Sequence, residues 1–156
     1  MPNWCDNIVN IKANATTIKE IKEYVAGYQN GNKKDFLLNS IIPMAGDWDY
    51  GWCVNNWGTK WEVEARLAVE EETSLIYSFD SAWSPPELVI AELAHRFPNC
   101  TIRHAYDEPG MDFGGYTIYN NGEEVCREEG QSHSMTWEQM STYPDFEPND
   151  NIQTAI

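Results

Sequence analysis

The order of hydrophobic and polar positions changes period along the first part of the chain. Residues 7–12 alternate at every second position, which is typical of a β-strand. Residues 17–28 instead place apolar side chains three and four apart, with charged side chains on the other face, which indicates an amphipathic helix. Thr17 and Glu20 fit a capping box at its start, and Gly27 opens a stretch rich in glycine and asparagine that should end it. The pattern predicts a strand followed by a helix.

The middle of the chain has a less regular pattern. An apolar run over residues 36–42, stopped by a proline, suits a second strand or an extended crossover. Residues 45–60 show no period and are expected to be irregular. Residues 61–70 and 75–80 alternate again, and the polar link between them is short enough for a hairpin. We therefore expect two paired strands after the irregular stretch.

The clearest helix start in the sequence lies just before residue 88. Ser84 can cap the helix, Pro85 suits the first helical position, and Glu87 completes a capping box. Trp83 and Leu88 are spaced to form a hydrophobic staple across this start. The apolar spacing then continues to a proline at position 98, so a second amphipathic helix is predicted.

The last third of the chain begins with strand-like patterns and then loses them. Residues 101–106 predict another strand. Residues 116–119 and 123–127 flank an Asn-Asn-Gly sequence, which is typical of a tight hairpin turn. Residues 136–140 predict one helical turn, and residues 143–150 show no regular pattern.

The order of these elements predicts the fold class. Strand, helix, strand, strand, helix, strand is the βαββαβ arrangement of ferredoxin-like folds, in which two helices pack on one face of an antiparallel sheet. We therefore expect an α+β protein with a ferredoxin-like domain over residues 1–130. An extra C-terminal hairpin belongs to this domain, and an irregular acidic tail over residues 131–156 follows it.

Composition narrows the class of protein. With 156 residues, 42% of them hydrophobic and 13% aromatic, the chain suits one folded domain and excludes disorder over most of its length. Ten basic and 25 acidic residues give a net charge of −15, which excludes nucleic-acid binding through a broad basic face. No apolar run approaches the roughly 18 residues of a membrane span. The first residues lack the basic and apolar regions of a signal peptide, so we expect a cytoplasmic protein.

Residues that bind metals are scattered along the sequence. They form no Cys-x-x-Cys or His-x-x-x-His spacing, so we expect no metal, no cofactor and, without a signal peptide, no disulfide. His104 lies in a predicted strand and is interpreted as a core or edge histidine rather than a catalytic base. The residues concerned are Cys5, Cys53, Cys100, Cys126, His95, His104 and His133.

Three short motifs carry a family resemblance. They are Met-Pro-Asn-Trp-Cys at residues 1–5, Asn-Asn-Trp-Gly-Thr-Lys-Trp at residues 55–61 and Ala-Trp-Ser-Pro-Pro at residues 82–86. Together they resemble the YubB-like family with a ferredoxin-like domain, small proteins carried by phages and plasmids, over roughly residues 1–127. The resemblance implies a ferredoxin-like fold and an origin on a mobile genetic element. It implies no activity, so no catalytic residue is assigned.

The distribution of charge favours a binding function. Residues 1–60 hold six basic and six acidic residues, whereas residues 61–156 hold four and nineteen, which accounts for the whole net charge. Such asymmetry indicates an interaction surface, although an acidic surface without a partner is the plainer alternative. Fifteen charges match roughly 25 Å of duplex DNA, if the acids share a face.

We therefore expect a non-enzymatic binding protein of a phage or plasmid that engages a basic host protein. In its sharper form it is a DNA-mimic inhibitor of a nucleic-acid-handling or defence protein. The predicted partner-binding residues are Glu62, Glu64, Glu70, Glu71, Glu72, Asp107, Glu108, Asp112, Glu123, Glu124, Glu128 and Glu129.

An alternative function starts from the four tryptophans between residues 48 and 61. Their aromatic faces, beside carboxylates and amides, are suited to stacking a base or sugar ring and bonding its edge. The alternative is a small pocket protein or enzyme that binds a nucleotide or sugar at this loop. The plainer interpretation makes Trp57, Trp61 and Trp83 structural. The candidate pocket residues are Asp47, Trp48, Asp49, Trp52, Asn55, Asn56 and Trp57.

Overall fold

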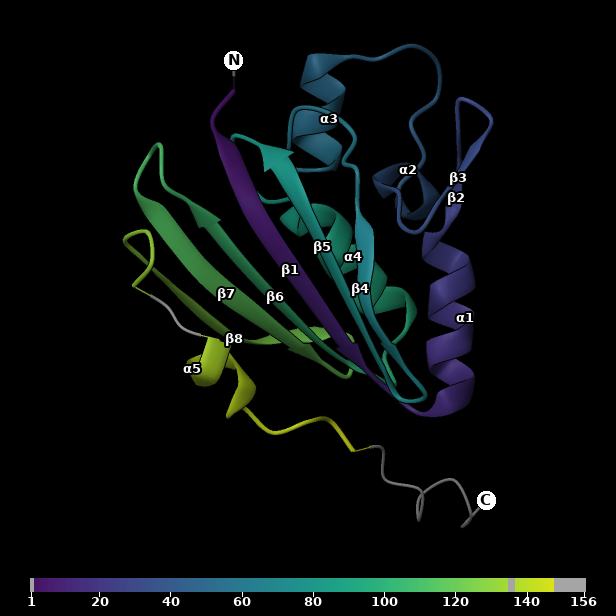
Figure 1. The fold of residues 1–156 in the computed structure, drawn as a ribbon, viewed down its shortest axis with the longest axis vertical. Helices are drawn as coiled ribbons and strands as arrows, with labels where there is room; N and C mark the ends of the chain where they lie inside the picture. Colours follow the sequence, from purple (N-terminus) through teal and green to yellow (C-terminus); the bar gives the residue numbers. More distant parts are fainter. Residues whose placement is uncertain (1, 135–136, 148–156) are drawn as a thin grey trace.

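The computed structural model describes residues 2–134 and 137–147, which form one six-stranded antiparallel sheet beside a small hairpin (Figure 1). The strand order in the large sheet is β4-β5-β1-β6-β7-β8. Its strands are β1 (Trp4–Lys12), β4 (Arg66–Glu71), β5 (Ser74–Ala82), β6 (Thr101–Glu108), β7 (Phe113–Asn120) and β8 (Glu123–Gly130). The small hairpin pairs β2 (Gly27–Gln29) with β3 (Asn32–Lys34).

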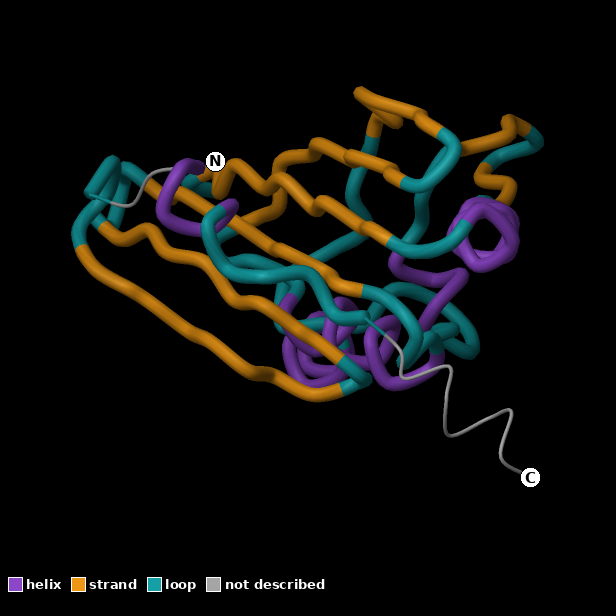
Figure 2. The backbone as a smooth tube through the Cα atoms, turned by 90° about the horizontal axis from the view of Figure 1, so that it is seen from below, coloured by secondary structure: helices purple, strands orange, loops and turns teal. Residues whose placement is uncertain are grey.

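The helices cover the two faces of the large sheet unequally. They are α1 (Ala15–Val25), α2 (Leu38–Ile41), α3 (Tyr50–Asn56), α4 (Glu87–Arg96) and α5 (Trp137–Ser141). Helices α1 and α4 pack on one face, here called the helix face, and α5 lies on the other, here called the open face (Figures 1 and 2). Strands β4, β5, β1 and β6 with α1 and α4 form the predicted ferredoxin-like arrangement. The predicted extra hairpin, β7–β8, extends this sheet beyond β6.

Alternation along β1 explains how the core and the open face are separated. Val9 and Ile11 are fully buried against α1 and α4, while the positions between them point to the open face. The helices contribute apolar side chains at helical spacing, among them Ile21 of α1 and Leu93 of α4. One apolar cluster therefore joins the two helices to the sheet, as the sequence pattern predicted.

Both boundaries of the first helix differ from the prediction. Asn14 is the N-cap, and its side chain accepts a hydrogen bond from the backbone N–H of Thr17 at 2.8 Å, so the Thr17–Glu20 capping box is wrong. The helix ends at Val25, and β2 begins at Gly27. Residues 30 and 31 have φ angles of 52° and 79°, which make the tight turn of the unforeseen β2–β3 hairpin.

Residues 36–42 were expected to form a second strand or an extended crossover, and both alternatives are wrong for residues 38–41, which form helix α2. The carboxylate of Glu62 accepts hydrogen bonds from the backbone N–H groups of Leu38 at 2.7 Å and Asn39 at 3.0 Å. These bonds satisfy free N–H groups at the start of α2 from a segment more than twenty residues away. A local pattern cannot reveal such a distant cap.

The stretch over residues 45–60 was expected to be irregular, but it contains helix α3. Asp49 caps this helix by accepting a hydrogen bond from the N–H of Trp52 at 2.9 Å. Regular strand pairing after it begins at Arg66 rather than at residue 61. The tryptophan-rich composition obscured a short helix, since a helix of seven residues gives little periodicity.

The predicted capping of α4 by Ser84 is also wrong. The helix begins at Glu87, its N-cap is Pro86, and no side chain caps it. The Ser84 hydroxyl instead donates to the carbonyl of Gly58 at 2.6 Å and ties two loops together. Trp83 and Leu88, expected to form a staple, both remain exposed.

The chain after β8 returns across the open face. Met140 of α5 is buried against Tyr116 and Ile118 of β7, and the N–H of Phe146 donates to Thr101 Oγ1 at 2.6 Å. Helix α5 corresponds to the helical turn predicted over residues 136–140, and residues 143–147 have no regular structure. The domain boundary predicted at residue 131 therefore does not coincide with a break in packing. The end of the predicted tail, residues 148–156, lies outside the described residues.

Candidate functional site

Three aspartates stand side by side on the open face of the sheet. Asp6 of β1 lies opposite Asp80 of β5 on one side and opposite Asp107 of β6 on the other. We call Asp80, Asp6 and Asp107 the aspartate row. Within residues 2–134 and 137–147, no Lys or Arg nitrogen lies within 4.0 Å of these carboxylates. The row therefore presents concentrated negative charge on neighbouring central strands.

The electrostatics of the row are unfavourable in the protein alone. Burial, a hydrogen bond with Asp80, and repulsion by Asp80 and Asp107 raise the pKa of Asp6 above its ordinary value. Like charges directly opposite each other on paired strands are destabilising. A cation bound at the row would relieve this repulsion.

One member of the row is held in place by the chain after β8. Asp107 accepts hydrogen bonds from Ser132 Oγ at 2.9 Å and from the backbone N–H of His133 at 2.8 Å. Gly114 on β7 leaves room for this carboxylate, since a Cβ there would lie 2.6 Å from Asp107 Oδ1. Asp107 is thus fixed, while Asp6 and Asp80 are exposed.

Indole rings lie near the row, at the end of the sheet where β1 begins. Trp4, on the same face as Asp6, is 44% exposed, and its ring lies 6.1 Å from that of Trp61. The indole N–H of Trp48 donates to the carbonyl of Lys60 at 3.0 Å, which places this exposed ring beside the same segment. We call Trp4, Trp48, Trp61 and Trp83 the tryptophan rim.

Trp83 is grouped with the rim because its backbone bonds to Asn3, next to Trp4, and its conformation is strained. Its φ angle is 72°, in the left-handed region that disfavours bulky side chains, and its side chain is 44% exposed. The backbone N–H of Trp83 donates to the carbonyl of Asn3 at 2.8 Å, and Asn3 is the neighbour of Trp4 in the chain. Trp83 was expected to be structural, and its exposure shows that it does not seal the core. Strain of this kind concentrates at functional sites.

The three sequence motifs meet beneath the rim. Thr59 Oγ1 donates to the carbonyl of Ala82 at 2.8 Å, and the Ser84 hydroxyl reaches Gly58. With the bond between Trp83 and Asn3, these contacts join residues from all three motifs at one end of the sheet. The motifs therefore build the end of the fold that carries the rim.

A buried chain of hydrogen bonds lies under the row, on the helix face. His104 Nε2 is 2.8 Å from Asn7 Oδ1, and Asn7 Nδ2 donates to Ser81 Oγ at 2.8 Å. Ser81 Oγ donates in turn to the carbonyl of Ser84 at 2.7 Å. Because Asn7 Nδ2 is a donor, its Oδ1 accepts, so the proton of the imidazole sits on Nε2.

The environment of His104 argues against catalysis by this residue. It is fully buried, and burial, with repulsion by Arg127, lowers its pKa to about 3. The ring is therefore neutral at ordinary pH and faces the core. The prediction of a core histidine is confirmed.

Two buried cysteines are held as thiols, and the described side chains form no metal-binding cluster. Burial raises the pKa of Cys5 and of Cys100 to about 12, so both remain thiols. Across residues 2–134 and 137–147, no three His, Cys, Asp or Glu side chains are arranged to hold a metal ion.

The predicted partner-binding acids do not share one face. Glu62 caps α2, and Glu108 is buried and accepts hydrogen bonds from the N–H groups of residues 110 and 111. Glu70–Glu72 lie at the β4–β5 hairpin, on the edge of the sheet opposite β8. The remaining predicted acids lie just before β4, in the β6–β7 loop and along β8: Glu64, Asp112, Glu123, Glu124, Glu128 and Glu129.

Of the predicted acids only Asp107 belongs to the row, and sequence reasoning missed Asp6 and Asp80. Asp6 precedes the alternating stretch that marked the first strand, and Asp80 ends another. Only the register between β5, β1 and β6 brings the three together. The alternation along each strand indicated which positions share a face of the sheet. It did not indicate which residues of neighbouring strands lie opposite each other.

The predicted nucleotide or sugar pocket is built differently from expectation. Asp49 caps α3, Asn56 Nδ2 donates to the carbonyl of Trp52 at 2.9 Å, and Trp57 is 2% exposed with its indole N–H bonded to the carbonyl of Ile42. These groups hold α3 in place. Asp47, Trp48 and Asn55 remain exposed, and of these Trp48 joins the rim.

Known proteins share this fold and parts of this sequence. The family model described as the ferredoxin-like domain in Api92-like protein matches residues 56–147. YubB of Escherichia coli strain K12 is 35% identical over 104 residues, which cover 65% of this chain and 64% of YubB. The alignment thus spans less than two thirds of that relative. The predicted resemblance to a YubB-like family is confirmed.

A solved structure supports the fold assignment. The crystal structure of protein Api92 from Yersinia pseudotuberculosis matches with a TM-score of 0.62, covering 88% of this chain and 100% of that one. The sequence identity is 12%, so the likeness is one of fold alone. No helix in the described part of this chain is long and apolar enough to cross a membrane.

Proposed function

The chain belongs to the family of Api92-like proteins with a ferredoxin-like domain, and we propose that it is a non-enzymatic binding protein whose partner presents a positively charged surface. The observation that carries the proposal is the aspartate row on the open face. Three carboxylates face one another there without a Lys or Arg partner among the described residues. A partner that supplies cations would remove a repulsion that the protein bears alone.

The tryptophan rim supports an arginine-rich partner in particular. A guanidinium group pairs with carboxylates through several N–H donors and also stacks on indole faces. Trp4 shares the open face with Asp6, so one arginine-bearing segment can contact both. The same acids would repel phosphates, so the partner is a protein rather than a nucleic acid.

The partner is, in the finer form of the proposal, a nucleic-acid-handling or defence protein of the host, and this chain inhibits it in the cytoplasm. The net charge of −15 and the resemblance to proteins of phages and plasmids support this form. The scattered positions of the other acids limit the mimicry of DNA to the row and its surroundings. A basic groove on the host protein would receive the open face near Trp4.

A pull-down from a host lysate tests the proposal. The bait is compared with a variant carrying Asp6→Asn, Asp80→Asn and Asp107→Asn, and with a control variant carrying Glu72→Gln, Glu123→Gln and Glu128→Gln. The two variants lose the same charge, but the control acids lie outside the row. We expect one basic protein to be captured by the wild type and by the control but not by the row variant. Equal capture by all three would refute the role of the row.

A further inference from the structure

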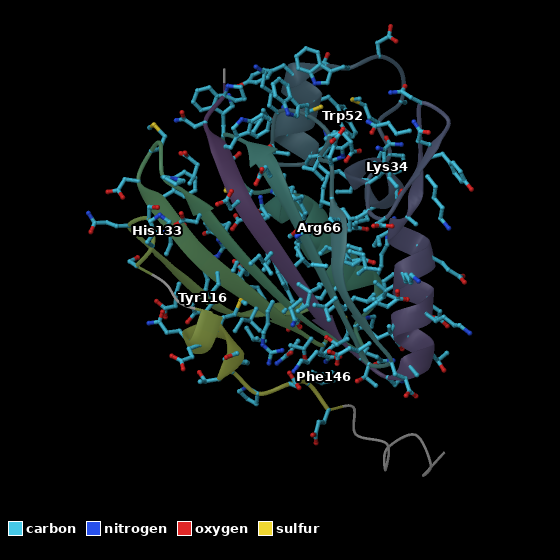
Figure 3. The ribbon with its side chains drawn as sticks, viewed as in Figure 1. Lys34, Trp52, Arg66, Tyr116, His133 and Phe146 are labelled. Atoms are coloured by element: carbon cyan, nitrogen blue, oxygen red, sulfur yellow. The ribbon has the colours of Figure 1, made fainter. Side chains whose placement is uncertain are left out.

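A polar cavity of about 600 Å³ lies on the open face, at the end away from the aspartate row. Strands β4, β5, β1 and β6 form its floor, and the chain after α5 forms its roof near Phe146 (Figure 3). Asn10 lines it four residues along β1 from Asp6, a separation of about 13 Å. Its size falls in the range of small-molecule sites, roughly 300–1,000 Å³.

Two buried polar side chains line this cavity without complete hydrogen bonding. Arg103 is 3% exposed, and its Nε and Nη1 have no hydrogen-bond partner among the described residues. Asn10, its cross-strand neighbour, is 5% exposed, and its Oδ1 is also unpartnered there. Buried polar groups are almost always hydrogen-bonded, so these donors and this acceptor indicate a missing partner.

The guanidinium is already fixed through its other nitrogen. Arg103 Nη2 donates to the carbonyl of Tyr143 and lies 2.6 Å from Asp145 Oδ1. Lys12 Nζ lies 3.9 Å from Asp145 Oδ2 and adds a second cation to the lining. The site is thus preorganised, with donors held in place rather than free to turn toward solvent.

The charges of the lining select the class of ligand. Two cations, Lys12 and Arg103, stand against three carboxylates, Glu71, Asp145 and Glu147. A free anion would meet net repulsion, whereas a molecule with both charges satisfies both sets. Its carboxylate would accept from Arg103, and its ammonium group would donate to Asn10 Oδ1 and face the acidic side chains.

We propose that this cavity binds a zwitterionic small molecule of the amino-acid type, independently of the partner surface. Val69, Ile76 and Phe146 add apolar surface for the ligand's side chain. The site shares strands with the aspartate row but none of its residues, so the two functions can be tested separately.

Titration with three matched probes, followed through the Nε–H resonance of Arg103 in NMR spectra, tests this proposal. The probes are L-leucine, 4-methylpentanoate, which lacks the ammonium group, and L-leucinamide, which lacks the carboxylate. We expect saturable shifts with leucine and at least roughly tenfold weaker binding of the other two, because each lacks one charge. No saturation with leucine, or equal binding of all three, would overturn the proposal.

Variants locate the binding in the cavity. Arg103→Lys keeps the charge but loses the unpartnered donors, and should weaken leucine binding roughly tenfold. Lys12→Gln changes an exposed side chain of the lining, so the protein should still fold. It therefore tests the cavity even if Arg103→Lys does not fold. Lys33→Gln, on β3 and outside the lining, removes the same charge and should bind leucine as the wild type does. A loss in Lys33→Gln equal to that in Lys12→Gln would contradict the site.

Discussion

Asp6 on β1 lies directly opposite Asp80 on β5, and neither carboxylate has a Lys or Arg partner among the described residues. Like charges opposite each other on paired strands destabilise the protein locally. The third member, Asp107, accepts hydrogen bonds from Ser132 and His133, so its carboxylate cannot turn away from Asp6. An arrangement that weakens the isolated protein but attracts cations suits a binding surface.

Neutralising Asp6 should stabilise the protein at neutral pH. The folded state raises the pKa of Asp6, so the protonated form contributes stability below the unfolded pKa of about 3.9, and this contribution is lost as pH rises through the folded pKa. Asp6→Asn should therefore raise the free energy of unfolding by about 0.2–1 kcal/mol at pH 7. The gain should vanish near pH 4. Urea unfolding at both pH values measures this, and a destabilised variant at pH 7 would contradict the account.

The imidazole of His104 should stay neutral far below the usual range. Its folded pKa of about 3 lies under the ordinary 6.5, so its contribution to stability is complete above pH 6.5 and is lost as pH falls toward 3. We expect the NMR signals of its ring to show an Nε2–H tautomer, unchanged between pH 7 and about 4.5. A His104 ring that protonates near pH 6 would show that the buried chain of hydrogen bonds is wrong.

Trp57 should be essential for stability rather than for binding. It is 2% exposed, and its indole N–H bonds to the carbonyl of Ile42 at 2.8 Å. Trp57→Ala should cost about 3–5 kcal/mol in the free energy of unfolding, through a cavity and an unpaired carbonyl. Denaturant unfolding measures this loss. Full stability combined with lost partner binding would instead favour a binding role for this indole.

Trp83 should show the opposite behaviour. Its φ angle of 72° suits glycine, and its side chain is largely exposed. Trp83→Gly should therefore leave the free energy of unfolding unchanged or raise it by up to about 1 kcal/mol, while weakening partner binding. The same unfolding experiment and the pull-down measure the two effects. A strongly destabilised Trp83→Gly would make this residue a structural one after all.

The sequence alone predicted the strands in which hydrophobic and polar side chains alternate clearly. It also predicted the order of strands and helices that defines the fold. The Asn-Asn-Gly turn at residues 120–122 and the amphipathic helices were visible in local patterns. Helix α2 was not, because its N–H groups are satisfied by Glu62 from a distant segment. Ser84 was misassigned for a similar reason, since its hydroxyl bonds to Gly58 in another loop.

The candidate site was harder to predict than the fold. The charge asymmetry pointed to acids after residue 60, yet Asp6 comes from the neutral part of the chain. Strand register joins it to Asp80 and Asp107, and register depends on long-range pairing that one sequence does not display. The unpartnered donors of Arg103 could not be predicted either. They depend on how the segment at Tyr143 packs over this side chain, which is a long-range contact.

Binding of a fluorescent deca-arginine peptide tests the central claim most directly. The wild type, the variant with all three aspartates of the row changed to asparagine, and the control variant with Glu72, Glu123 and Glu128 changed to glutamine are titrated at low and at physiological salt. Affinity should fall with salt for all three, since exposed charges are screened beyond about 8 Å. At either salt concentration the row variant should bind roughly tenfold more weakly than the control variant. Equal affinities of the two variants would contradict the claim that the row is the binding surface.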